Sequence, residues 1–158
     1  MRHRRLARTL AMQALFEIDA VGHDPEPTLG HRFEDLETDV PADVEGFTRK
    51  LLWGVLDNKN DIDGFIRKHA SAWPLEEIAI LDRNILRIAI FELLHEPDTP
   101  PRVAINEAVE LAKRFGNEST RRFVNGVLGA VLTDLEQSGR LPKRTKARAR
   151  LARTVEQE

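Results

Sequence analysis

Cysteine is absent from this chain of 158 residues, so disulfide bonds, zinc sites built on thiolates and a cysteine nucleophile are all excluded. The sequence also has no apolar run close to the roughly 18 residues that a membrane-spanning helix needs. Its start, from Met1 to Arg5, lacks the apolar stretch of a secretory signal peptide. We therefore expect a cytoplasmic protein without a membrane partner.

Patterns typical of catalytic and metal sites are missing as well. The five histidines include no pair spaced four residues apart and no H-E-x-x-H motif, so we expect no metal. No phosphate-binding loop is present, and we expect no cofactor. Glu76 with Glu77, and Glu107 with Glu110, adjoin apolar stripes and are predicted to lie on solvated helix faces. The sequence thus indicates a binding protein without catalytic residues.

Charge is distributed unevenly along the chain, although the formal net charge is only −2. Between Asp24 and Asp63 there are eleven carboxylates and four lysines or arginines. Both ends of the chain are basic. The arginines of the start are Arg2, Arg4, Arg5 and Arg8. A polyanion would be attracted to the ends and repelled by much of the body.

Apolar residues recur at intervals of three to four positions, which predicts an all-α protein. With 41% hydrophobic residues, the chain fits one compact domain or two small helical subdomains. The first apolar stripe predicts a helix that ends near Gly22. A polar linker with a short helix around residues 31–37 should follow, and then a long helix from Pro41 to about residue 66. The segment from Asn58 to Gly64 is a weak point in that helix.

Trp73-Pro74 interrupts the helical pattern, because proline disfavours a helical conformation of the residue before it. We place a subdomain boundary there. The subdomains are predicted to span about residues 1–72 and 73–139, and a basic, disordered tail should occupy residues 140–158. Trp53 and Trp73 are expected in the core or at the interface between the subdomains.

Three helices are predicted in the second half of the chain. The segment from Ile85 to Leu94 is apolar nearly all round, as expected of a helix at the centre of a bundle. Another helix should run from Ala104 to Phe115. Ser119 or Thr120 is expected to cap the last helix, which should end near Gly139.

Two segments carry a family resemblance. The segment from Val103 to Phe115 reads V-A-I-N-E-A-V-E-L-A-K-R-F, and the segment from Phe123 to Leu128 reads F-V-N-G-V-L. Both resemble the hallmark segments of the NusB family of bacterial transcription antitermination factors. The resemblance extends from Arg4 to about Leu135 and implies an all-α, NusB-like helical bundle of two packed helical subdomains.

The resemblance also implies a function in RNA binding. Members of the family bind boxA RNA together with NusE, a ribosomal protein, and assemble with NusA, NusG and RNA polymerase to support transcription of ribosomal RNA operons. No catalysis is implied. Family members are either monomers or homodimers, and both states remain open for this chain.

Family positions that contact RNA carry over to the arginine-rich start, to an aromatic residue late in the first helix and to the start of the last helix. By resemblance, the RNA-binding residues are Arg2, Arg4, Arg5, Arg8, Phe16, Ser119, Thr120, Arg121, Arg122 and Phe123. Guanidinium groups neutralise phosphates and stack on bases, and free amides at a helix start favour phosphate. Phe16 stands where the family often has tyrosine and offers a stacking face, or else it belongs to the core. Glu76 and Asp82 are expected on the face that binds NusE.

Two other functions compete with this interpretation. A NusB-like domain also addresses RNA in certain ribosomal RNA cytosine methyltransferases, but a catalytic domain with cysteines would have to follow, and 158 residues without cysteine leave no room for it. The second alternative is a helical adaptor that binds only protein. The basic tail either adds nonspecific RNA affinity or is solvated chain.

Overall fold

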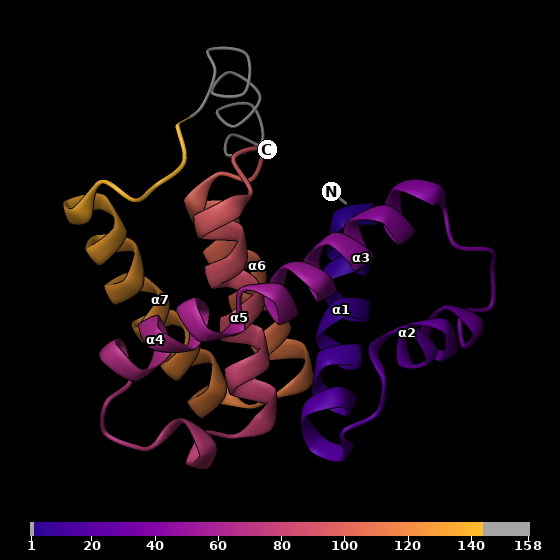
Figure 1. Ribbon diagram of the computed structural model, residues 1–158, viewed down its shortest axis with the longest axis horizontal. Coiled ribbons are helices and arrows are strands. Elements are labelled where there is room, and N and C mark those ends of the chain that lie inside the picture. Colours follow the sequence, from indigo (N-terminus) through magenta and orange to yellow (C-terminus); the bar gives the residue numbers. More distant parts are fainter. Residues whose placement is uncertain (1, 144–158) are drawn as a thin grey trace.

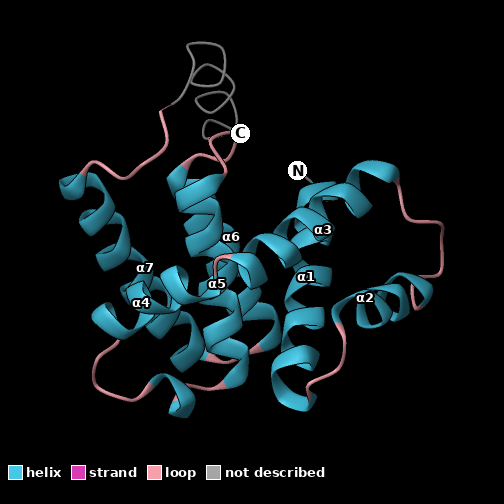
Figure 2. Ribbon diagram, viewed as in Figure 1, coloured by secondary structure: helices cyan, strands magenta, loops and turns pink. Residues whose placement is uncertain are grey.

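The computed structural model of the protein describes residues 2–143 and is all-α over that range, as the sequence predicts (Figure 2). Its elements are α1 (Arg2–Val21), α2 (Pro25–Glu34), α3 (Ala42–Asp57), α4 (Lys59–His69), the 3-10 helix η1 (Leu75–Glu77), α5 (Ile80–His95), α6 (Pro101–Phe115) and α7 (Glu118–Ser138). Among these helices, none combines the length and the apolar character needed to cross a membrane. Residues 144–158 of the predicted tail lie outside the described residues.

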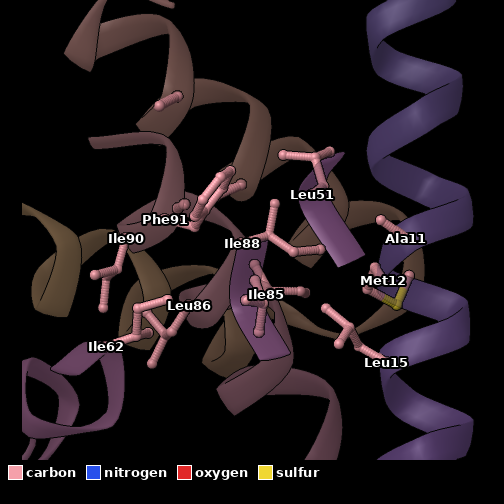
Figure 3. Close-up of a cluster of buried hydrophobic side chains, with 14 of the residues drawn as sticks. Ala11, Met12, Leu15, Leu51, Ile62, Ile85, Leu86, Ile88, Ile90 and Phe91 are labelled. Carbon is pink, nitrogen blue, oxygen red and sulfur yellow. The ribbon is translucent and has the colours of Figure 1, made fainter. Parts of the chain in front are cut away.

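Helix α5 lies at the centre of the bundle and packs against α1, α3, α4, α6 and α7. Every residue from Asn84 to Leu94 is buried, which confirms the prediction made from its apolar character. Figure 3 shows the core around this helix. The labelled side chains are Ile85, Leu86, Ile88, Ile90 and Phe91 of α5, Leu51 of α3, Ile62 of α4, and Ala11, Met12 and Leu15 of α1. Each leucine or isoleucine buried in this way stabilises the fold by roughly 1.5–3 kcal/mol.

The chain changes its packing partners at Asn58. Helices α2 and α3 pack against α1 on one side of α5, whereas α4 packs mainly against α5 and α7 (Figure 1). Asn58 separates α3 from α4, and its Nδ2 donates a hydrogen bond to the carbonyl oxygen of Gly54 at 2.7 Å. The predicted weak point is therefore confirmed. This packing favours a subdomain division near Asn58, while the division near residue 72 stays a prediction.

The start of α2 differs from the prediction. A short helix was expected around residues 31–37, but α2 begins at Pro25. Asp24 occupies the N-cap position, and proline suits the first helical position because its fixed φ matches the helix and its missing N–H is not needed there. Leu29 is then buried against the core. The prolines of this segment start a helix rather than extend a linker.

The start of α7 also differs, whereas its end is as predicted. Asn117, rather than Ser119 or Thr120, is the N-cap: its Oδ1 accepts a hydrogen bond from the Thr120 amide at 3.0 Å, and its own amide donates to the Thr120 hydroxyl at 3.3 Å. Thr120 is thus the second member of a capping box. Gly139 ends the helix with a φ of 69°, a left-handed conformation that glycine adopts without strain.

A buried ion pair joins α1 to α5. The Nε and Nη2 atoms of Arg8 donate hydrogen bonds to the two carboxylate oxygens of Glu92 at 2.7 and 3.0 Å. Both residues are almost completely buried, Arg8 at 3% and Glu92 at 1% exposure. Removing one partner from such a pair costs roughly 3–5 kcal/mol, because the other charge is left in the core without compensation.

A second ionic contact joins the far end of α1 to the start of α5. The Asp19 carboxylate accepts hydrogen bonds from Arg83, Asn84 and Arg87 at 2.7 to 2.9 Å. Arg87 also donates to both oxygens of Asp63 on α4, at 2.8 and 3.1 Å. Asp19 lies eleven residues after Arg8, about 16 Å along the helix, so the two contacts fix both the position and the rotation of α1 on α5.

Acid should weaken the contact at Asp19. Burial raises the pKa of this carboxyl, but hydrogen bonds from Arg83 and Asn84 and the charge of Arg87 outweigh burial and hold the pKa well below its ordinary value. Because the folded pKa is depressed, the stabilisation is present at neutral pH and is lost as the pH falls below about 4, the ordinary pKa of aspartate.

Urea unfolding of Asp19→Asn between pH 7 and pH 3 should show lower stability at pH 7 and a smaller fall towards pH 3. Asp57→Asn, which removes an exposed carboxylate, should keep the steeper wild-type dependence; equal slopes for Asp19→Asn and wild type would refute this role.

Helix α3 crosses α5 closely at Gly54. A Cβ added there would overlap the ring of Phe91, whereas a Cβ at Gly46, on the exposed side of the same helix, would meet nothing. Gly54→Ala should therefore destabilise the protein by about 1–3 kcal/mol through overpacking. Gly46→Ala should stabilise it by about 0.5–1 kcal/mol, since alanine favours a helix over glycine. Chemical denaturation distinguishes the two, and a neutral Gly54→Ala would mean that the helices do not approach as described.

Candidate nucleic-acid interface

The arginine-rich start forms the first turns of α1, but its four arginines have different environments. Arg2 is exposed, and the guanidinium of Arg4 lies 4.0 Å from the centroid of the Phe47 ring. Arg5 donates to both carboxylate oxygens of Glu107 on α6, at 3.1 and 3.0 Å, and half of its side chain stays exposed. The first turn of α1 contains no acidic residue. The positive end of the helix dipole and these cations together favour a polyanion.

Arg8 does not belong to this surface. It was predicted to contact RNA, but it is almost completely buried and donates from Nε and Nη2 to Glu92, so it is poorly accessible to a phosphate. One signal in the sequence points to such a partnership: Glu92 is, with Arg87, one of two ionisable residues in the otherwise apolar segment from Ile85 to Leu94, and a buried carboxylate requires a cation. Glu107 is similarly buried against Arg5, although a solvated position was predicted for it.

Phe16 lies on the same face of α1 as Arg5, because a separation of eleven positions makes about three helical turns. Phe16 is 40% exposed, so the alternative in which it belongs to the core is wrong. It borders a groove of about 420 Å³ whose lining is largely apolar. The groove is lined by Met12, Gln13, Phe16, Glu17, Ala20, Val21, Arg32, Leu81 and Phe115. An open aromatic ring beside such a groove is suited to stacking or to an apolar partner.

The start of α7 contains the remaining predicted RNA-binding residues. Ser119 is exposed, Thr120 is buried in the capping box, and Phe123 is half-buried. Glu118 forms ion pairs with Arg121 and Arg122, and the hydrogen bond from Arg121 lowers the pKa of Glu118 to about 2. Arg122 is 75% exposed in its side chain and stands 3.6 Å from Glu118, so it is the cation of this turn that is most accessible to a phosphate.

A second cavity, of about 520 Å³, lies at the start of α7. It is lined by Trp73, Glu77, Ile78, Ala79, Asp82, Asn117, Ser119, Thr120 and Phe123. Leu81 lines the groove at Phe16 and Asp82 lines this cavity, so the two hollows meet the first turn of α5 at neighbouring residues. Arg5, the Phe16 groove and this cavity therefore follow one another along α1, the end of α6 and the start of α7.

The two tryptophans and the two acidic residues expected at the NusE face have the following environments. Trp73 was expected in the core or at an interface, but 63% of it is exposed. Burial raises the pKa of the Asp82 carboxyl, and a hydrogen bond from the Thr120 hydroxyl offsets part of this effect. Glu76 is exposed on η1, where its backbone oxygen accepts a hydrogen bond from Arg83. Trp53, the other tryptophan, is partly exposed and donates from Nε1 to Glu26 at 2.9 Å.

Known proteins resemble this chain in sequence. The NusB family model matches residues 5–133. Transcription antitermination protein NusB from Dehalococcoides mccartyi is 48% identical over 130 residues, which cover 81% of this chain and 88% of that protein. The protein of the same name from Bacillus pumilus is 41% identical over 134 residues, covering 85% of this chain and 98% of that protein.

Solved structures agree with the sequence relatives. A structure of antitermination factors NusB and NusE in complex with dsRNA superposes with a TM-score of 0.78 and 28% identity, over 85% of this chain and 98% of that chain. NusB from T. maritima superposes with a TM-score of 0.76 and 34% identity, over 83% of this chain and 91% of that chain. The bundle around α5 is thus the NusB fold, and with the match over residues 5–133 the chain belongs to the NusB family.

Proposed function

We propose that this protein is a transcription antitermination factor that binds boxA-type RNA together with NusE and supports transcription of ribosomal RNA operons. The observation that carries the proposal is the arginine start of α1, with Arg5 on the same helix face as Phe16, followed by the Phe16 groove and the cavity at the start of α7, which border each other at Leu81 and Asp82. This arrangement joins exposed cations to open aromatic rings, which is the combination that binds single-stranded RNA.

The residues of this surface have different proposed roles. Arg2, Arg4 and Arg122 neutralise phosphates, and Arg5 does so while bound to Glu107. Phe16 contributes its exposed ring to the groove. Arg121, already paired with Glu118, and Ser119, Thr120 and Phe123 shape the second contact region. Arg8 acts only through α1, whose position it fixes.

Protein partners complete the proposed function. Glu76 is exposed on η1, and Asp82 lines the cavity at the start of α7. We assign NusE to the side of Glu76, with Asp82 at the border between NusE and RNA. The relative that superposes on this chain is seen with NusE and dsRNA. NusA, NusG and RNA polymerase would then join the assembly in the cytoplasm. A homodimer would have to leave the arginine start open for RNA to bind.

Removing two cations from the start of α1, the exposed Arg2 and the half-buried Arg4, tests the phosphate contacts. Arg2→Gln combined with Arg4→Gln should weaken binding of labelled boxA-type RNA, measured by fluorescence anisotropy with NusE present. Each lost phosphate contact reduces the slope of log K against log salt by about 0.7 for a single strand, so the slope should decrease by about 1.4 and binding at 0.15 M salt should be roughly tenfold weaker.

The matched control removes the same charge from another helix. Lys59→Gln with Arg67→Gln changes two exposed cations at the ends of α4 and should leave the slope at its wild-type value. A scrambled RNA reports sequence preference. If the two double variants have equal effects, the arginine start contributes only nonspecific electrostatic attraction. If the wild-type protein binds NusE but neither RNA, the protein is an adaptor that binds only protein.

A further inference from the structure

Trp73 is the most exposed of the large aromatic side chains in the described residues, at 63%. It precedes Pro74 and η1, and it borders the cavity of about 520 Å³ at the start of α7. This volume lies within the roughly 300–1,000 Å³ typical of pockets that hold small organic groups. The family resemblance assigns no RNA contact to Trp73. An indole left in solvent beside a cavity offers a stacking face that the fold itself does not use.

The lining of the cavity combines three segments of the chain. Trp73 comes from the loop before η1, Asp82 from the first turn of α5, and Thr120 and Phe123 from the start of α7. Two aromatic rings and several polar groups thus border one hollow. Packing of α5 against α7 and the Asn117 capping box hold two of these segments in place, and η1, which follows Trp73, packs against α4. The cavity is therefore preformed.

The charges around the cavity determine which chemical groups can bind in it. Glu77 and Asp82 line it, and no lysine or arginine is among its lining residues. A phosphate group is disfavoured inside, because two carboxylates would repel it. Arg122, three-quarters exposed on the same turn of α7 as Phe123, offers a cation close by. A nucleotide suits this arrangement when its uncharged base enters the cavity and its phosphate stays near Arg122.

We propose that this cavity binds one unstacked base of single-stranded RNA, which stacks on Trp73 while the Asp82 carboxylate accepts a hydrogen bond from an amino group of the base. An ionised carboxylate only accepts hydrogen bonds. Adenine, cytosine and guanine carry exocyclic amines, whereas both exocyclic groups of uracil are acceptors. The cavity therefore prefers a base with an amino group over uracil. This inference rests on the proposed RNA-binding function and adds a residue and a base preference to it.

The energetics of Asp82 agree with such a role. Its carboxylate is partly desolvated, which raises its pKa, and the single hydroxyl of Thr120 compensates only in part. A base amine would supply the missing donor. Asp82→Asn keeps the size of the side chain, removes the partly buried charge and should not lower the stability of the protein.

The first experiment measures anisotropy of labelled boxA-type RNA with the full chain and NusE, using Trp73→Ala, Trp73→Phe and Trp53→Phe. Loss of the stacking surface in Trp73→Ala should weaken binding roughly 5- to 100-fold, the effect of removing one aromatic–base stack. Trp73→Phe should retain most of the affinity. Trp53→Phe changes the tryptophan that contacts α2 instead and should bind like wild type. In this last variant Trp73 is the sole tryptophan, and its fluorescence should be quenched by RNA.

A second experiment tests the base preference. Wild type and Asp82→Asn are compared on RNAs in which each position in turn carries uracil or an amino-bearing base. Wild type should prefer the amino-bearing base at one position, and Asp82→Asn should lose that preference, because an amide both donates and accepts. Equal discrimination by the two proteins would overturn the role of Asp82.

The outcomes separate this inference from the proposed function. If wild type binds boxA-type RNA with NusE and Trp73→Ala binds it equally well, the cavity is not a base site and the proposed function stands. If wild type itself fails to bind, the proposed function fails as well. If Trp73→Ala loses affinity for NusE in the absence of RNA, while RNA binding by the saturated complex is unchanged, the cavity belongs to the protein interface and the inference is wrong.

Discussion

The candidate surface depends on the buried ion pair between Arg8 of α1 and Glu92 of α5. This pair, with the contacts of Asp19 at the other end of α1, attaches the helix to the central helix at two points about three turns apart. Arg2, Arg4, Arg5 and Phe16 all belong to α1, so their distance from α6 and α7 follows from this attachment. A shift of α1 along α5 would leave both buried charges without their partners, so the pair opposes a change of register.

The role of each arginine in α1 depends on the residue that it contacts. Arg8 and Arg4 are one helical turn apart, yet Arg8 is paired with a carboxylate in the core and Arg4 lies on an aromatic ring at the surface. Arg5 is intermediate, paired with Glu107 and half exposed. A buried, paired arginine stabilises position, and an exposed one remains available to phosphate. The short basic segment therefore serves both the fold and the proposed RNA site.

Sequence periodicity and family resemblance predicted the all-α fold, the central position of α5 and the break near Asn58, because these follow from the spacing of apolar residues. The start of α2 was misplaced because Asp24-Pro25 was interpreted as a linker rather than as a helix start. The burial of Arg8 and the exposure of Trp73 depend on which residues lie opposite them in the folded chain, Glu92 in one case and the cavity at α7 in the other. Glu92 in an apolar segment indicates that a buried cation pairs with it, but local pattern does not identify Arg8 as that cation or place Trp73 beside the cavity.

The measurement that tests the central claim most directly is a double-mutant cycle of Arg8→Met and Glu92→Leu, with stability determined by urea unfolding. Each single variant should lose roughly 3–5 kcal/mol, because it leaves one buried charge without its partner, and the double variant should lose at least about 2 kcal/mol less than the sum. Losses that add to within about 0.5 kcal/mol would contradict the account, because the two residues would then act independently and would not hold α1 in register on α5.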